Sequence, residues 1–143
     1  MNVVCGGIVC QDYTLLLVHN RACQTLNVPY MCPPGGKREP AESSQECVQR
    51  ELFEELGILV QPKRLLGIYD MLEYPSGPQQ VHTYACQWVS GVVQNKEPYK
   101  LKTVEWYNIN QIFEFKESGI LAKTLEAILD SPDFHKHFRG QLL

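Results

Sequence analysis

The sequence predicts a single α+β domain over residues 1–143, in which a mixed β-sheet is layered between helices. Strand-like segments come first, followed by a helix, more strands and a second helix, and this order favours a layered domain over a purely parallel doubly wound sheet. The 143 residues are enough to bury one core, and the content of 44% apolar and 20% charged residues is typical of a soluble globular protein.

The first strands are predicted from two apolar, β-branched segments. Val3–Cys10 and Tyr13–His19 are separated by the polar pair Gln11-Asp12, a pattern that indicates a β-hairpin. Residues 21–30 have no regular pattern, and Pro33-Pro34-Gly35-Gly36 predicts a loop ahead of the first long helix.

Residues 43–56 give the clearest helical signal. Ser43 and Glu46 match a capping box, and Gly57 follows the last turn, where a left-handed residue often ends a helix. An apolar residue recurs at every fourth position from Val48 to Leu56, which predicts one buried stripe.

The second half of the chain repeats the pattern of strands followed by a helix. We expect strands at Leu65–Tyr74, Val81–Val89 and Thr103–Tyr107, a helical turn at Asn108–Phe113, and an amphipathic helix at Ile120–Leu129 that ends before Ser131-Pro132.

Composition excludes several classes of protein. The net charge of −3, with both signs interspersed, argues against a broad cationic face for nucleic acid or membrane. No segment approaches the roughly 20 apolar residues of a membrane span, and the N-terminus does not resemble a signal peptide, so we expect a cytoplasmic protein. The six cysteines form no C-x-x-C pair, which predicts buried thiols rather than disulfides or a zinc site.

Three carboxylates of the predicted helix share one face. Glu51, Glu54 and Glu55 stand at i, i+3 and i+4. On an ordinary helix such spacing indicates a solvated acidic face, and the alternative is a site for a hard cation such as Mg²⁺ or Mn²⁺. The preceding Pro34-Gly35-Gly36 favours the cation site, because paired glycines let the backbone turn sharply and approach a ligand.

Residues 36–58 read GKREPAESSQECVQRELFEELGI and resemble the Nudix box, G-x5-E-x7-R-E-U-x-E-E-x-G-U, where U is a bulky aliphatic residue. All nine specified positions are met, namely Gly36, Glu42, Arg50, Glu51, Leu52, Glu54, Glu55, Gly57 and Ile58. The surrounding strand order is also similar to the family's, so the resemblance implies a Nudix-type α/β/α sandwich.

The resemblance further implies a division of roles. Members of the family hydrolyse a nucleoside diphosphate linked to another group, X, with divalent metal ions. By position, the metal ligands are Glu51, Glu54, Glu55 and the carbonyl of Gly35. Arg50 orients the glutamates through charge-assisted hydrogen bonds, and Gly36 and Glu42 support the loop and the start of the helix. We assign the general base to Glu54, although some family members use a loop carboxylate.

Within the family, the chain is most similar to the MutT-like nucleoside triphosphate pyrophosphohydrolases. The stretch from Glu97 to Tyr107 resembles the segment that precedes their final helix. Met31 stands where family members often have tryptophan, and the late-loop metal-binding glutamate of some members has no clean match, with Glu97 and Glu105 as candidates.

Four residues are candidates for binding the nucleotide: Arg21, Tyr30, His82 and Trp106. The alternatives are a solvated arginine at a strand end, a hydrogen-bonded sheet histidine, and a tryptophan that packs the sheet edge. His135-x-His137 has the spacing of metal ligands, but an exposed basic tail explains it better.

The leading hypothesis is cleavage of a (deoxy)nucleoside triphosphate to monophosphate and pyrophosphate with Mg²⁺ or Mn²⁺. ADP-ribose, a dinucleoside polyphosphate or the 5′ end of RNA are alternative substrates, and the balanced charge disfavours RNA. A non-catalytic nucleotide-binding module is the alternative from a different class. The apolar strand surfaces and the 120–129 helix are compatible with either a homodimer or burial within one subunit.

Overall fold

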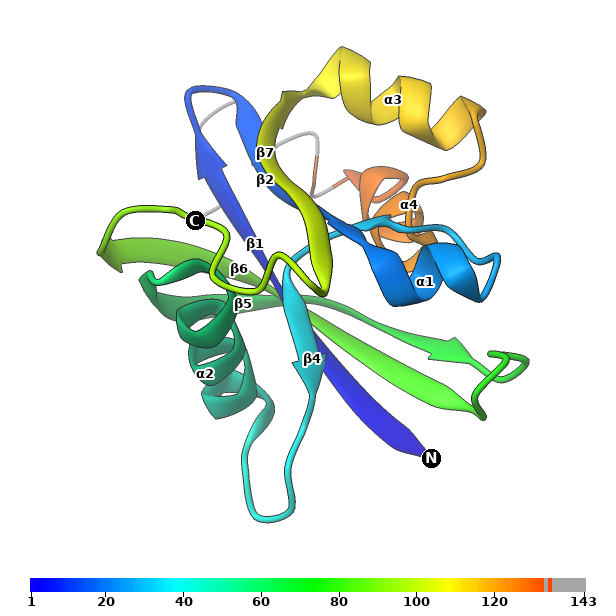
Figure 1. Cartoon of the computed structure of the whole chain (residues 1–143), viewed down its shortest axis with the longest axis horizontal. Helices are drawn as coiled ribbons and strands as arrows, with labels where there is room; N and C mark the ends of the chain where they lie inside the picture. Colours follow the sequence, from blue (N-terminus) through cyan, green and yellow to red (C-terminus); the bar gives the residue numbers. More distant parts are fainter. Residues whose placement is uncertain (133, 135–143) are drawn as a thin grey trace.

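The computed structural model describes residues 1–132 and 134, and His135-x-His137 lies outside this part of the chain. Its core is a mixed sheet with helices on both faces, so the predicted fold class is confirmed (Figure 1). The strands are β1 (Asn2–Gln11), β2 (Thr14–Asn20), β3 (Met31–Cys32), β4 (Gly35–Lys37), β5 (Leu59–Met71), β6 (Gln79–Ser90) and β7 (Leu101–Asn108). The helices are α1 (Arg21–Thr25), α2 (Ser44–Leu56), α3 (Ile109–Glu117) and α4 (Lys123–Leu129).

The seven-stranded sheet has the path β3-β2-β1-β6-β5, with β4 paired to β1 and β7 paired to β2. Only β1 and β6 run parallel among these paired strands, with Val4 opposite Val81. The expected β1–β2 hairpin is present, and Asp12 and Tyr13 form its turn with positive φ angles of 48° and 63°.

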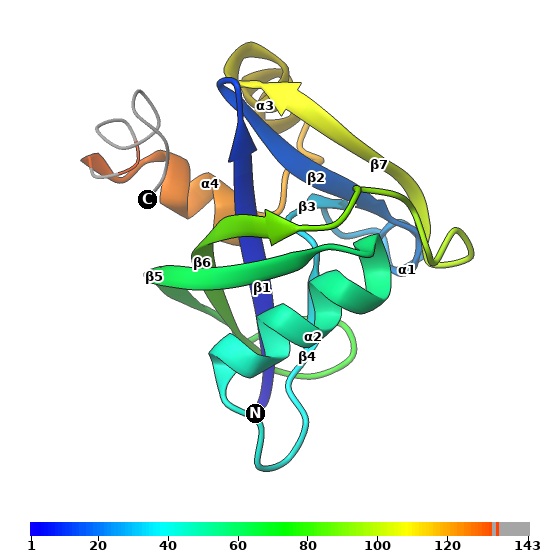
Figure 2. The same ribbon diagram turned by 90° about the vertical axis from the view of Figure 1, so that its left-hand side faces the viewer.

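Alternation along the central strands separates two cores. Val9 and Leu16 face α2 on one side of the sheet, while Ile8 and Leu17 face α3 and α4 on the other. Figure 2 shows the same arrangement, with α2 on one face of the sheet and α3 and α4 on the opposite face. The sheet is therefore the middle layer of an α/β/α sandwich.

Several expected boundaries differ from those of the structure. Residues 35–37 form β4 rather than loop, because Gly35 and Gly36 pair with β1 opposite Gly6 and Cys5. Strand β5 begins at Leu59 rather than at Leu65 and accommodates Pro62 at a register shift on the sheet edge.

The last helix begins later than expected. Residues 120–122 are not helical, because Leu121 forms a bridge with Met31 and the N–H of Ala122 donates to the Met31 carbonyl. The irregular segment after β2 contains the short helix α1, which is capped by Asn20.

None of the cysteines in the described residues forms a disulfide, and Cys5, Cys47 and Cys86 are buried. Within residues 1–132 and 134, no helix is long and apolar enough to cross a membrane.

Candidate active site

Helix α2 carries the predicted metal-binding carboxylates. Ser43 and Glu46 form the expected reciprocal capping box, and Gly57 ends the helix with φ 72°. With the apolar stripe of α2 fully buried against the sheet, Glu51 and Glu55 are also largely buried, at 8% and 4% exposure. The Glu54 side chain is 49% exposed.

The glycine loop lies directly against these carboxylates. The backbone N–H of Gly35 donates to Glu55 Oε1 at 2.9 Å. A Cβ added to Gly36 would lie 2.5 Å from the carboxyl carbon of Glu51, and one added to Gly35 would lie 2.0 Å from the Cys5 carbonyl oxygen. Both glycines are therefore required by close packing rather than by turn geometry alone.

Arg50 links the loop to the acidic face. Its Nε donates to Glu42 Oε2 at 2.7 Å and its Nη2 to Glu42 Oε1 at 3.0 Å, a two-pronged pair. Its Nη1 contacts Glu51 Oε1 at 2.9 Å and Glu54 Oε2 at 3.4 Å, and Nη2 also donates to the Lys37 carbonyl at 3.0 Å. The hydrogen bonds from Arg50 lower the pKa of Glu42 to about 2.

A fourth carboxylate, Glu97, reaches the same place from the segment between β6 and β7. The N–H groups of Gln94 and Lys96 donate to the carbonyls of Leu56 and Glu55, at 3.1 and 2.9 Å, and attach this segment to the end of α2. Glu97 Oε2 accepts a hydrogen bond from the Tyr99 hydroxyl at 2.9 Å. Glu97 Oε1 is buried and has no hydrogen-bond partner among the described residues.

The crowding of carboxylates perturbs their titration. Burial, the charge of Glu51 and, more weakly, the charge of Glu97 raise the pKa of Glu55 to about 8. Burial also raises the pKa of Glu51, and the hydrogen bond from Arg50 opposes that rise. A positive charge close to these groups would therefore stabilise their ionised forms.

The donor set fits a divalent cation. In the described residues, no three His, Cys, Asp or Glu side chains are grouped closely enough to hold a metal ion as they stand. Glu51 and Glu54 instead contact Arg50, and Glu55 accepts from Gly35. The oxygen ligands, the raised pKa of Glu55 and the unpartnered Glu97 Oε1 nevertheless match the chemistry of Mg²⁺ or Mn²⁺.

The other late-loop candidate, Glu105, lies elsewhere. It is exposed on β7, opposite Leu17 of β2. The structure thus brings Glu97, and not Glu105, to the acidic face of α2.

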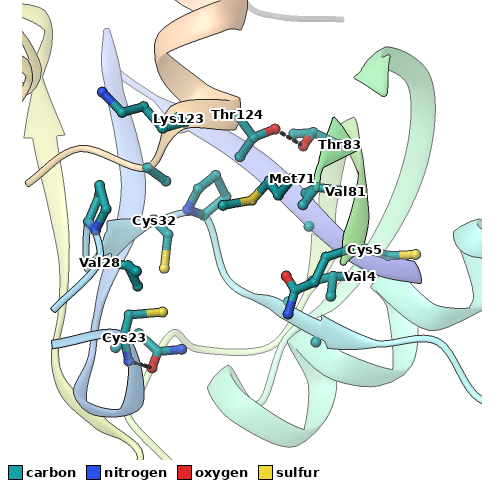
Figure 3. Close-up of a pocket in the computed structure, with 18 of the residues that line it drawn as sticks. Val4, Cys5, Cys23, Val28, Cys32, Met71, Val81, Thr83, Lys123 and Thr124 are labelled. Carbon is teal, nitrogen blue, oxygen red and sulfur yellow. Dashed lines mark hydrogen bonds between the residues drawn. The ribbon is translucent and has the colours of Figure 1, made fainter. Parts of the chain in front are cut away.

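A cavity of about 230 Å³ adjoins Glu55, Gly35 and Gly36. Its walls are mostly apolar and come from β1, β2, β5, β6 and the segments around α1 and α4, as Figure 3 shows for Val4, Val28, Met71 and Val81. This volume far exceeds the roughly 10–15 Å³ that one water molecule needs, so the cavity can hold a compact organic group beside the carboxylates.

The cavity also has polar groups among its lining residues. Thr83 and Thr124 hydrogen-bond to each other at 3.2 Å, and Cys23 Sγ lies 3.6 Å from the Tyr74 hydroxyl. Lys37 borders the cavity at the glycine loop and Lys123 at the start of α4. The two lysines place positive charge at its edge.

None of the four residues predicted to bind the nucleotide is among those that line this cavity. Arg21 donates from Nε to the Pro98 carbonyl at 3.1 Å, and Tyr30 stacks on His19. His82 forms hydrogen bonds with Ser44 and Gln80. Trp106 stacks on Trp88, and both pack against the core that lies between the sheet and α2.

The chain matches the NUDIX domain over residues 2–128. It belongs to the Nudix family. The α2 helix and the glycine loop are thus its Nudix box, and the family predicted from the sequence is confirmed.

Similar proteins are Nudix hydrolases. A MutT NUDIX hydrolase from Burkholderia pseudomallei has a TM-score of 0.68 at 25% identity. The alignment covers 76% of this chain and 84% of the hydrolase chain. A NUDIX hydrolase from Nitrosomonas europaea has a TM-score of 0.73 at 26% identity, and the alignment covers 94% of this chain and 88% of that hydrolase.

One curated relative is an ADP-ribose pyrophosphatase of Methanocaldococcus jannaschii, 28% identical over 115 residues. The alignment covers 77% of this Nudix chain but spans only 63% of the length of that relative.

Proposed function

We propose that this Nudix protein is a metal-dependent pyrophosphohydrolase that cleaves a nucleoside triphosphate to monophosphate and pyrophosphate. The observation that carries the proposal is that the acidic face adjoins a mostly apolar cavity, since Glu55 contacts the glycine loop and also lines the cavity. A nucleotide whose base occupies the cavity would place its phosphates at the carboxylates.

The cation would be held by Glu51, Glu54, Glu55 and the carbonyl of Gly35, with Glu97 as a further ligand. When bound, it would neutralise the charge of the phosphates and lower the pKa of an attacking water. Glu97 is included because its unpartnered Oε1 is buried next to this face, whereas Glu105 is remote from the loop that contacts α2.

The protein's own residues would position and activate the reactants. Arg50 orients Glu51 and Glu54 and is itself fixed by the two-pronged pair with Glu42. Lys37 would contact a phosphate at the cavity edge. We assign proton removal to Glu54, because its half-exposed side chain has a single long contact of 3.4 Å with Arg50 and can reach water.

ADP-ribose is the second candidate substrate, because one curated relative is an ADP-ribose pyrophosphatase. It contains the same diphosphate and would use the same carboxylates. The two candidates differ in the group beyond the diphosphate.

The test is a substrate panel with Mg²⁺ or Mn²⁺, comprising canonical and oxidised dNTPs, ribonucleoside triphosphates, ADP-ribose, diadenosine polyphosphates and triphosphorylated RNA. Products are identified by ion-exchange chromatography. Release of monophosphate and pyrophosphate from a triphosphate supports the proposal. Cleavage of ADP-ribose alone would replace the substrate assignment, and no cleavage of any compound would contradict the enzymatic proposal.

A further inference from the structure

The side-chain amide of Asn20 has a fixed orientation at the cavity wall. Asn20 is the last residue of β2, is half-buried and lines the cavity. Its Oδ1 accepts a hydrogen bond from the backbone N–H of Cys23 at 3.1 Å and thereby caps α1. Figure 3 marks this bond at Cys23. Because only the oxygen of an amide can accept from an N–H group, the cap determines which way the amide faces.

The Nδ2 group of Asn20 is then the group left for a ligand. It carries two N–H donors and has no hydrogen-bond partner within residues 1–132 and 134. An amide donor beside an apolar cavity gains most from a ligand oxygen that accepts from it. The cap prevents the amide from turning over to offer its oxygen instead.

The neighbouring polar groups do not reverse this preference for a ligand oxygen that accepts a hydrogen bond. Burial raises the pKa of both Cys23 and Cys32, so both remain protonated thiols at neutral pH. Cys32 donates weakly to the Val18 and Tyr30 carbonyls, at 3.9 and 3.8 Å. Gln79 also lines the cavity, but its amide is not fixed by a cap and can rotate to donate or to accept.

We propose that Asn20 selects nucleotides whose base presents a ring carbonyl oxygen, such as hypoxanthine, guanine or uracil, over adenine. This inference rests on the proposed function, in which the cavity holds the base. Adenine has no carbonyl, and a base that directs its position 6 toward Asn20 would bring the amino group of adenine, itself a donor, to a fixed donor. Such a mismatch leaves polar groups unpaired on both sides, which is the effective way for a site to reject an analogue.

The decisive comparison uses inosine triphosphate and adenosine triphosphate, which differ only at position 6 and the adjacent ring nitrogen. We expect the wild-type protein to favour inosine triphosphate in kcat/KM by about tenfold or more. In Asn20→Asp, one carboxylate oxygen still caps Cys23 while the other becomes an acceptor, so the preference should fall or reverse. A role in folding alone would not reverse a ratio between two substrates.

Asn108→Asp is the matched control. Asn108 caps α3 through the same bond, from the Gln111 N–H to Oδ1 at 2.9 Å, and does not line the cavity. This variant should keep the wild-type ratio. If Asn20→Asp does not fold, Asn20→Ser supplies a second variant, because serine also caps helices but lacks the amide donors, and its ratio should approach one.

Binding of the two nucleotides, measured by calorimetry without added metal, separates the two proposals. Absence of hydrolysis with either nucleotide would contradict the proposed function, while tighter binding of inosine triphosphate would still support the role of Asn20. Equal binding and equal turnover in the wild type, or a ratio unchanged in the folded Asn20 variants, would overturn the inference. A preference for adenine nucleotides would overturn it as well.

Discussion

The backbone N–H of Gly35 donates to Glu55 Oε1 at 2.9 Å, and this bond joins strand β4 to the last turn of α2. Glu55 is 4% exposed, so the carboxylate has little freedom apart from this contact. Positions of the loop and of the carboxylate are therefore coupled, and a change in either should alter the other.

Gly36→Ala should reduce turnover strongly while the protein remains folded. The added Cβ would lie 2.5 Å from the carboxyl carbon of Glu51, so the carboxylate must move. Gly35→Ala should cost more stability, because its Cβ would meet the backbone of Cys5 at 2.0 Å. Steady-state kinetics and urea unfolding distinguish the two effects.

Gly67→Ala is the control for these substitutions. Its Cβ would meet only Ile128 Cγ1, at 4.0 Å, so activity and stability should stay close to wild type. Wild-type turnover in Gly36→Ala would contradict the placement of Glu51 against the loop.

Glu42→Gln should destabilise the protein at neutral pH by about 2 kcal/mol, because it removes one partner of a charged, two-pronged pair with Arg50. The pair lowers the pKa of Glu42 from 4.5 to about 2, so the folded state binds fewer protons than the unfolded state between these values. The stabilisation is thus complete above pH 4.5 and is lost as the pH falls toward 2.

Urea unfolding from pH 7 to pH 2.5 tests this dependence. The difference in the free energy of unfolding between wild type and Glu42→Gln should become smaller as the pH falls. Glu39→Gln is the control, since Glu39 is 64% exposed and lies 3.8 Å from Arg50, and it should change stability little at any pH. If the difference in the free energy of unfolding between wild type and Glu42→Gln does not change with pH, the ion pair is not the cause of that difference.

The metal-free protein should lose stability as the pH rises from about 4.5 toward 8. Burial and the charge of Glu51 raise the pKa of Glu55 from 4.5 to about 8, so the folded state binds more protons than the unfolded state in this window. Thermal unfolding in EDTA should show the decline, and Mg²⁺ or Mn²⁺ should offset it most at the alkaline end.

Glu55→Gln supplies the comparison for this titration, because glutamine does not ionise. The variant should show a smaller decline in EDTA and a smaller gain from added cation. An identical decline in the variant would assign the titration to another group.

Glu97→Gln should raise the Mg²⁺ concentration needed for half-maximal activity by about tenfold or more, the effect typical of residues that support a metal site. Glu105→Gln, which changes an exposed carboxylate on β7, should leave it unchanged. Equal effects of the two substitutions, measured by metal titration of the initial rate, would remove Glu97 from the site.

The sequence predicted α2 to within one residue, because its capping box, apolar stripe and terminal Gly57 are all local signals. It also identified the carboxylates that α2 brings to one face. The strand β4 was missed, since its two glycines are typical of a turn and only their pairing with β1 makes them a strand.

The cavity could not be predicted in this way, because its walls come from segments far apart in the sequence. Asn20, Met71 and Thr124 meet there only through the sheet order and the packing of α4. Likewise, Glu97 reaches Glu55 through two backbone hydrogen bonds between the 94–96 segment and the end of α2, which leave no trace in local sequence. Tyr30 and Trp106, which the sequence offered as candidates for binding the nucleotide, stack on His19 and Trp88.

The most direct test of the central claim is the initial rate of diphosphate cleavage by Glu54→Gln and Glu55→Gln, measured with the best substrate of the panel beside wild type in Mg²⁺ and in excess EDTA. We predict that both variants fold, as judged by circular dichroism, and that cleavage in both, and in wild type with EDTA, falls to the rate of buffer alone. Cleavage at the wild-type rate in both variants, or undiminished cleavage in EDTA, would contradict a metal-dependent reaction at the acidic face of α2.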